Sequence, residues 1–254
     1  MTLHFNDSGV GIPVVFLHAF PLSSKMWSSQ VSSVVDAGFR AITIDLPGFG
    51  RSGGSIRSIP ETARLVLSVC DHLGIKRFGL CGLSMGGYVS FEIIRAVPER
   101  IRFAVLCDTT PEADSEEKRS ERFESSAEIL NDGPHRFLEG MKNGFLSDKT
   151  SSDPKLQNEF DELFSEADSK SMAAALEAMA VRSSSKGDVE HFGFPVVAIY
   201  GAEDPMIGAG RSMAASAPSG SFIEIEGAGH FSNLEQPESF NKALIAFLKE
   251  HAVE

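Results

Sequence analysis

The sequence predicts an α/β fold with a mostly parallel central sheet, helices on both faces of that sheet, and a helical cap insertion. The first observation is that apolar strand-like runs alternate with amphipathic helices over the first 110 residues. The second is that the runs are apolar throughout, as expected for parallel strands that are buried on both faces. The third is that the alternation stops near residue 111 and resumes after residue 190.

The expected elements of the first part of the chain follow one another without a break. We expect strands over 14–18, 40–45, 77–83 and 102–107, and helices over 25–37, 61–73 and 87–97. The last of these helices ends before Pro98, because the residue that precedes a proline disfavours the helical conformation. Strands over 196–201 and 221–225 and a helix over 237–249 complete the prediction.

The insertion differs from the rest of the chain in composition. Residues 111–190 contain 19 acidic and 10 basic residues, and their apolar residues follow helical spacing at Phe160, Leu163 and Phe164 and at Met172, Leu176 and Met179. We therefore predict a core of residues 1–110 and 191–254 and a helical cap of residues 111–190. Its charges are expected to face solvent.

An insertion after residue 107 lies over the carboxyl edge of the sheet, so some of its apolar residues should form the ceiling of a cleft. The candidates for substrate contact are Phe137, Met141, Phe164 and Met179. The alternative for each is that it only packs the cap helices against the core.

The pentapeptide Gly82-Leu83-Ser84-Met85-Gly86 joins an expected strand to an expected helix. A serine on such a sharp turn needs small neighbours, because the strained backbone brings other parts of the chain into contact. The turn holds the hydroxyl above the sheet and directs the first amides of the helix beside it. Ser84 is therefore a candidate nucleophile.

Two further residues supply a candidate acid and base. Asp204 follows the strand 196–201, and His230 follows the strand 221–225 in the sequence Gly227-Ala228-Gly229-His230-Phe231. Both lie just beyond carboxyl ends of strands, which is where open α/β sheets place their sites. Asp108, just after the strand that ends at Cys107, is an alternative acid.

With these motifs in place, the chain resembles the α/β-hydrolase superfamily, in particular small bacterial serine esterases, enol-lactonases and non-metal haloperoxidase-like enzymes. The resemblance rests on four segments, 16–22, 45–52, 82–87 and 227–231. It implies a nucleophile–acid–base order of Ser84, Asp204 and His230. One departure is Ala19, which follows His18 where the family usually has glycine.

The resemblance also implies an oxyanion hole formed by the backbone N–H groups of Phe20 and Met85. His18 is expected to shape this loop rather than act as a second base. Asp45 and Arg51 are expected to hold the turn at 48–52, with contact between Arg51 and substrate as the alternative. The remaining histidines lack a motif and are expected to have surface or packing roles: His4, His72, His135, His191 and His251.

Composition excludes several classes of partner. A net charge of −12 disfavours nucleic acid and anionic membranes. No run approaches the roughly 18 apolar residues of a membrane span, and the first apolar stretch is too short for a signal peptide, so a cytoplasmic location is expected. Cys70, Cys81 and Cys107 are odd in number and lack metal-ligand spacing, which predicts buried free thiols.

The sequence therefore predicts a serine carboxylesterase that cleaves small, fairly apolar esters through an acyl-serine intermediate, without a metal or organic cofactor. Serine at position 84 excludes dehalogenase chemistry, which needs a carboxylate nucleophile. A lactonase resembling 3-oxoadipate enol-lactonase, a C–C bond hydrolase or a perhydrolase stays open. A lactone that carries a carboxylate would call for a pocket cation such as Lys25, Arg51 or Arg182. A ligand receptor that uses the cap as a switch is the alternative from another class.

Overall fold

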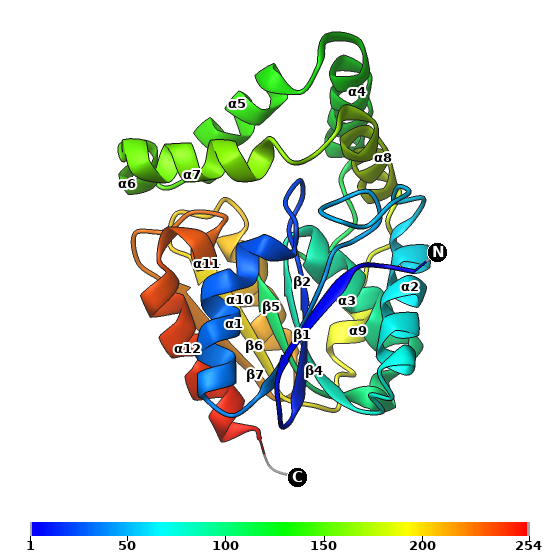
Figure 1. Cartoon of the computed structure of the whole chain (residues 1–254), viewed down its shortest axis with the longest axis vertical. Coiled ribbons are helices and arrows are strands. Elements are labelled where there is room, and N and C mark those ends of the chain that lie inside the picture. The colour runs from blue at the N-terminus through cyan, green and yellow to red at the C-terminus, as the bar shows by residue number, and fades with distance from the viewer. Residues whose placement is uncertain (1, 253–254) are drawn as a thin grey trace.

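The computed structural model describes residues 2–252, and its centre is a seven-stranded sheet in the order β1-β3-β2-β4-β5-β6-β7 (Figure 1). All neighbouring pairs are parallel except β1 and β3. The strands are β1 (Phe5–Gly9), β2 (Pro13–Leu17), β3 (Arg40–Ile44), β4 (Phe78–Leu83), β5 (Ile101–Cys107), β6 (Val196–Gly201) and β7 (Gly220–Ile225). The predicted fold class is confirmed.

Helices cover both faces of this sheet (Figure 1). One pair, α1 (Ser28–Asp36) and α12 (Pro237–Glu250), packs together on one face, and another, α2 (Ile59–His72) and α3 (Met85–Ala96), packs on the other. The remaining elements of the core are η1 (Ser24–Trp27), η2 (Pro98–Arg100), α9 (Lys186–Val189), α10 (Ile207–Ser216) and α11 (Ser232–Glu235).

Strand β1 and helix α10 are the longest elements of the core that were not predicted; η2, α9 and α11, of three or four residues each, were not predicted either. Strand β1 has the sequence FNDSG, which lacks an apolar run because the strand lies at the edge of the sheet and is only partly buried. Helix α10 is rich in small residues, and its Gly210 packs so close to Tyr200 that a Cβ there would lie 2.5 Å from the Tyr200 ring. The secondary structure of β1 and α10 therefore depends on contacts with neighbouring elements more than on the hydrophobic periodicity of their own sequences.

Residues 111–190, the predicted cap, contain six helices. The last of them, α9, lies beside the core and contacts α10, whereas the other five lie above the carboxyl end of the sheet in Figure 1. They are α4 (Glu116–Asp132), α5 (His135–Phe145), α6 (Asp148–Ser151), α7 (Pro154–Phe164) and α8 (Ser169–Ala180). Helices α4 and α8 pack against each other, whereas α5, α6 and α7 extend over the other side of the sheet. We call these five helices the cap.

Local sequence signals start most of the cap helices. A serine or aspartate side chain accepts a hydrogen bond from a backbone N–H in the first turn of α4, α6, α7 and α8, which satisfies donors that have no partner within the helix. The capping residues are Ser115, Ser147, Asp153 and Asp168.

The core packs around aromatic side chains beneath these helices. Trp27 is fully buried, with its ring 5.3 Å from Phe16 and 6.2 Å from Phe240. Cys70, Cys81 and Cys107 are buried free thiols, as predicted. Within residues 2–252, no helix is both long and apolar enough to cross a membrane.

Phe240 anchors α12 to the core, so we expect Phe240→Ala to lower the free energy of unfolding by about 3–5 kcal/mol, the usual cost of deleting a buried aromatic ring. Urea unfolding followed by circular dichroism measures this change. Lys242→Ala on the exposed side of the same helix is the control and should stay within about 0.5 kcal/mol. Equal stability of the two variants would contradict the packing role of Phe240.

Candidate functional site

Ser84 lies on the turn between β4 and α3, in a backbone conformation that only glycine adopts readily. Its φ is 53° and its ψ is −113°. Two contacts hold this turn: the Ser84 N–H donates to the Cys107 carbonyl at 2.9 Å, and the Thr109 hydroxyl donates to the Ser84 carbonyl at 2.8 Å. The carboxyl end of β5 therefore supports the turn.

Gly82 and Gly86 on either side of Ser84 are required because backbone atoms of other residues approach both positions closely. A Cβ on Gly86 would lie 2.1 Å from the Leu17 carbonyl oxygen, and a Cβ on Gly82 would lie 2.5 Å from the Gly86 carbonyl oxygen. Neither position has room for a side chain. This is the physical basis of the glycine pattern that the sequence presented around Ser84.

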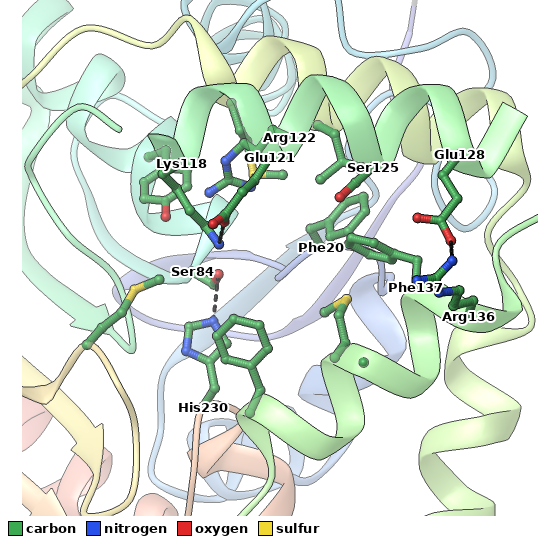
Figure 2. Close-up of a pocket in the computed structure, with 17 residues that line it drawn as sticks. Phe20, Ser84, Lys118, Glu121, Arg122, Ser125, Glu128, Arg136, Phe137 and His230 are labelled. Carbon is green, nitrogen blue, oxygen red and sulfur yellow. Dashed lines mark hydrogen bonds and ion pairs between the residues drawn. The ribbon is translucent and has the colours of Figure 1, made fainter. Parts of the chain in front are cut away.

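His230 joins Ser84 to Asp204 through both nitrogens of its ring. Nε2 lies 2.9 Å from the Ser84 Oγ, and Nδ1 lies 3.1 Å from the Asp204 Oδ1. Figure 2 shows the Ser84–His230 contact at the base of the cleft. The three residues that the sequence singled out are thus within hydrogen-bond reach of one another in the order nucleophile, base, acid.

Asp204 is buried beside this histidine. Burial opposes ionisation of its carboxyl group, but the charge and hydrogen bond of His230 outweigh burial and place the pKa of Asp204 below its ordinary value. The Met206 N–H also donates to Asp204 Oδ1 at 2.9 Å. An ionised Asp204 can hold the imidazole in one orientation and stabilise its charged form.

Asp108, the alternative acid, makes no hydrogen bond to His230 within residues 2–252. Its carboxyl group accepts from the Gly201 N–H at 2.9 Å and from the Ser232 hydroxyl at 2.5 Å. Burial, together with the negative charge of Asp204, raises the pKa of Asp108 well above its ordinary value. The pKa values of the two buried carboxyl groups are therefore shifted in opposite directions, and the geometry favours Asp204 as the partner of His230.

Sequence reasoning missed Glu235, which fixes the loop that carries His230. The buried Glu235 carboxylate accepts from the N–H groups of Gly229 at 3.0 Å, Phe231 at 3.2 Å and Ser147 at 2.9 Å. The backbone N–H of His230 donates to the backbone carbonyl of Phe145 in the cap at 2.7 Å. The bonds to Gly229 and Phe231 are local, but the bond to Ser147 joins residues far apart in the sequence, so no local pattern could reveal that Glu235 links the cap to this loop.

The amides of Phe20 and Met85 are free to bind an oxyanion. Met85 is the first residue of α3, and neither amide donates a hydrogen bond to protein within residues 2–252. Ala19 replaces the usual glycine of this loop and is fully buried, with its N–H directed at the Met26 sulfur at 3.2 Å.

The His18 side chain holds the same loop through two hydrogen bonds to backbone groups. The Leu46 N–H donates to its Nε2 at 2.9 Å, so the proton is on Nδ1, which donates to the Ala19 carbonyl at 2.9 Å. Complete burial lowers the pKa of His18 to about 4. A neutral histidine with both nitrogens occupied is a structural residue, in line with the prediction.

Asp45 organises the neighbouring turn. It accepts from the N–H groups of Ser24 at 2.8 Å and Arg51 at 3.0 Å, and its Oδ2 lies 3.0 Å from the His4 Nδ1. Arg51 contributes this backbone group while its exposed side chain does not line the cleft. Of the other histidines, His72, His135, His191 and His251 also lie outside the cleft.

A cleft of about 310 Å³ opens onto Ser84 and His230. One side of it is apolar and is formed by Phe20, Phe137, Met141, Phe145, Leu176, Met179 and Met206. Phe164, the fourth predicted contact, does not line the cleft. It is buried against Phe160 and Phe231, with ring centroids 5.8 Å and 6.0 Å away.

Polar side chains also line the cleft, and we call the face of α4 that carries them the polar wall. Lys118 and Glu121 on this face are 50% and 61% exposed, as the prediction of solvent-facing cap charges requires, whereas Arg122 is only 12% exposed and departs from it. Helix α4 directs one face toward the cleft, and Figure 2 shows its side chains above Ser84: Lys118, Glu121, Arg122, Ser125 and Glu128. Their spacing of three or four residues is that of one helix face. The apolar prediction had considered only the methionine, leucine and phenylalanine residues of the insertion.

The three cations proposed for a carboxylated lactone do not line the cleft. Lys25 pairs with Glu166, and Arg51 points outward. Arg182 is buried, pairs with Asp114 at 2.6 Å and lies over the Tyr88 ring at 4.0 Å. The cations that do line it, Lys118, Arg122 and Arg136, were not singled out from the sequence.

Comparison with known proteins agrees with this fold. The sequence pattern of the alpha/beta hydrolase family matches residues 14–243, so the chain belongs to this family and the predicted resemblance is confirmed.

Individual relatives carry different hydrolase names. A thermophilic esterase from Thermogutta terrifontis, solved with malate bound, superposes with a TM-score of 0.94 at 31% identity over 99% of this chain and 94% of its own. A 2-hydroxy-6-oxononadienedioate/2-hydroxy-6-oxononatrienedioate hydrolase of Paraburkholderia phymatum is 26% identical over 98% of this chain and 91% of its own. The 3-oxoadipate enol-lactonase 2 of Acinetobacter baylyi is 26% identical over 93% and 88%.

The buried neutral His18 should make stability depend on pH. Its folded-state pKa of about 4 lies below its ordinary value of 6.5, so below pH 6.5 the unfolded chain binds a proton that the folded chain refuses. The free energy of unfolding therefore keeps the full contribution of neutral His18 above pH 6.5. As the pH falls toward 4 it decreases by about 3 kcal/mol in total.

Urea unfolding between pH 7 and pH 4 measures this loss. His18→Gln should remove this part of the pH dependence while other titrating groups keep theirs. An identical pH profile in protein and variant would contradict the role assigned to His18.

Proposed function

We propose that this protein is a serine hydrolase that cleaves small carboxylic esters through an acyl-serine intermediate. The observation that carries the proposal is the hydrogen-bonded series from Ser84 through His230 to Asp204, at 2.9 Å and 3.1 Å, facing an open cleft. A nucleophile, a base within reach of it, and a group that orients the base are the parts that acyl transfer requires.

The reaction begins with attack of the Ser84 Oγ on the ester carbonyl carbon while His230 Nε2 takes the hydroxyl proton. Negative charge then develops on the carbonyl oxygen, where the amides of Phe20 and Met85 stabilise it. One such donor is worth roughly 2.7–4 kcal/mol. Asp204 stabilises the protonated imidazole without taking its proton.

Collapse of this intermediate releases the alcohol, which leaves with the proton held by His230. Water then enters, His230 removes one of its protons, and the resulting hydroxide attacks the acyl-serine carbonyl. The acid product departs as the proton returns to the Ser84 oxygen. Each half of the reaction uses the same base and the same oxyanion donors.

The cleft supports a short acyl group with an apolar part. Its volume of about 310 Å³ is at the lower end for ligand sites, and aromatic and methionine side chains form one of its walls. A lactone is the second substrate class, because ring opening is the same acyl transfer with the alcohol still attached. The turnover rate on simple esters distinguishes an enzyme from a ligand receptor, because a receptor would bind its ligand tightly and hydrolyse it slowly.

Esters of increasing acyl length test the proposal directly. We expect multiple turnover of p-nitrophenyl acetate and butanoate, falling for long chains that exceed the cleft. Ser84→Ala should lower kcat by at least about 10³-fold, since loss of the nucleophile leaves only the oxyanion donors and binding. Activity that is unchanged in this variant, or absent from the protein itself, would overturn the proposal.

A matched pair of substitutions distinguishes the two buried carboxyl groups. Asp204→Asn should lower kcat by about 10⁴-fold, because an amide no longer holds the correct imidazole tautomer. Asp108→Asn should lower it less than tenfold, because Asp108 makes no hydrogen bond to His230 within residues 2–252 and an amide oxygen can still accept from the Gly201 N–H and the Ser232 hydroxyl. The reverse ranking in steady-state kinetics would make Asp108 the catalytic acid.

A further inference from the structure

The polar wall of the cleft contains an excess of positive charge next to Ser84. The Asp114 side chain is 5% exposed and pairs with two arginines, Arg122 and Arg182, at 2.6 Å each. Burial opposes ionisation of Asp114, but the charges of the two arginines outweigh it and hold the pKa of that carboxyl below its ordinary value. Two guanidinium groups thus share one carboxylate, which leaves this cluster with one positive charge.

Part of this cluster is available to a ligand. Arg122 donates through Nε to Asp114 and directs Nη1 at the Met179 sulfur at 3.7 Å, a weak contact, while Nη2 has no partner within residues 2–252. Only 12% of its side chain is exposed, and it lines the cleft. A partly desolvated guanidinium with unused donors favours an anionic partner.

Tyr88 lies beneath the same wall. It stands one helical turn after Ser84 on α3, is 3% exposed, lines the cleft, and has a hydroxyl without a hydrogen-bond partner within residues 2–252. The Arg182 guanidinium lies 4.0 Å over its ring and fixes the position of the side chain. The ring is buried, while the hydroxyl opens onto the cleft and makes no hydrogen bond to the described residues, so it can donate to a ligand there.

Lys118 adds a second, movable cation. Its ammonium group pairs with Glu121 at 2.9 Å, and Figure 2 shows both side chains extending from α4 above Ser84. The Glu121 side chain is 61% exposed, so it can release Lys118 to a ligand and remain in water.

We infer that Tyr88, Lys118 and Arg122 form a subsite for a carboxylate that the substrate carries besides its scissile ester. The preferred substrates are then half-esters of short dicarboxylic acids, or lactones with a free carboxylate. The apolar wall contacts the methylene groups between the two functions. This inference rests on the proposed function, because the subsite is defined by its position next to Ser84.

Three ethyl esters of similar shape test the inference. Monoethyl succinate carries a carboxylate, ethyl 4-methylpentanoate is its neutral isostere, and ethyl 4-aminobutanoate carries an ammonium group. We expect kcat/KM for the anionic ester to exceed that for the neutral ester at least about tenfold. Equal rates for the two, or preference for the ammonium ester through Glu121, would overturn the subsite while leaving the esterase function intact.

Substitutions then show which residues produce the preference for the anionic ester. Arg122→Gln should lower the anionic-to-neutral ratio of kcat/KM by about 10- to 100-fold, the range for lost hydrogen bonds to a charged group. Tyr88→Phe removes only an unpartnered hydroxyl, so it should fold even if Arg122→Gln does not, and should lower the ratio by about threefold or more. The matched control is Arg119→Gln, which removes a charge from the outer side of α4, where Arg119 lies over Phe123.

An unchanged ratio in both Arg122→Gln and Tyr88→Phe, or an equal fall in Arg119→Gln, would contradict a local subsite. If no ester is hydrolysed, the proposed function fails, and calorimetry still tests the subsite. Monoethyl succinate should then bind the Ser84→Ala protein more tightly than ethyl 4-methylpentanoate does, and Tyr88→Phe in addition should weaken that binding. Equal binding of both esters would overturn the subsite by itself.

Discussion

The arrangement of the site depends on the close contact between the start of α3 and the end of β2. Gly86 sits where any side chain would strike the Leu17 carbonyl, so α3 can begin this close to β2 only with glycine there. Ser84, two residues earlier, occupies the strained turn that leads into α3. The loop that carries Phe20 follows β2 directly, so the two amides proposed for the oxyanion belong to the segments on either side of this contact.

The cap is hydrogen-bonded to the loop of residues 227–231 that carries His230, which we call the histidine loop. Phe145 and Ser147 at the end of α5 are hydrogen-bonded to His230 and Glu235, so the position of the cap and the position of the imidazole are set by the same group of bonds. The Phe145 ring also lies 4.6 Å from the His230 ring. Movement of this part of the cap would therefore disturb the base, whereas α4 has no such bond to the histidine loop within residues 2–252.

Burial acts differently on the two carboxyl groups near the base. Asp204 is stabilised as an anion by His230, and the neighbouring Asp108 is driven toward its neutral form by burial and by the Asp204 charge. On the polar wall, Asp114 stays ionised because two arginines compensate its burial. Charge at this site is thus distributed in pairs and clusters, and the cluster around Asp114 is left positive.

The sequence by itself determined the fold class, the glycine-flanked Ser84 and the order of Ser84, Asp204 and His230, because strand periodicity and tight turns are properties of neighbouring residues. Only the tertiary structure decided that Asp204 rather than Asp108 faces His230, that Glu235 holds the histidine loop, and that Phe164 is buried while Lys118 and Arg122 line the cleft. These outcomes depend on how α4 and α5 are placed over the sheet. Helical spacing alone states which residues share a face but leaves open what that face covers.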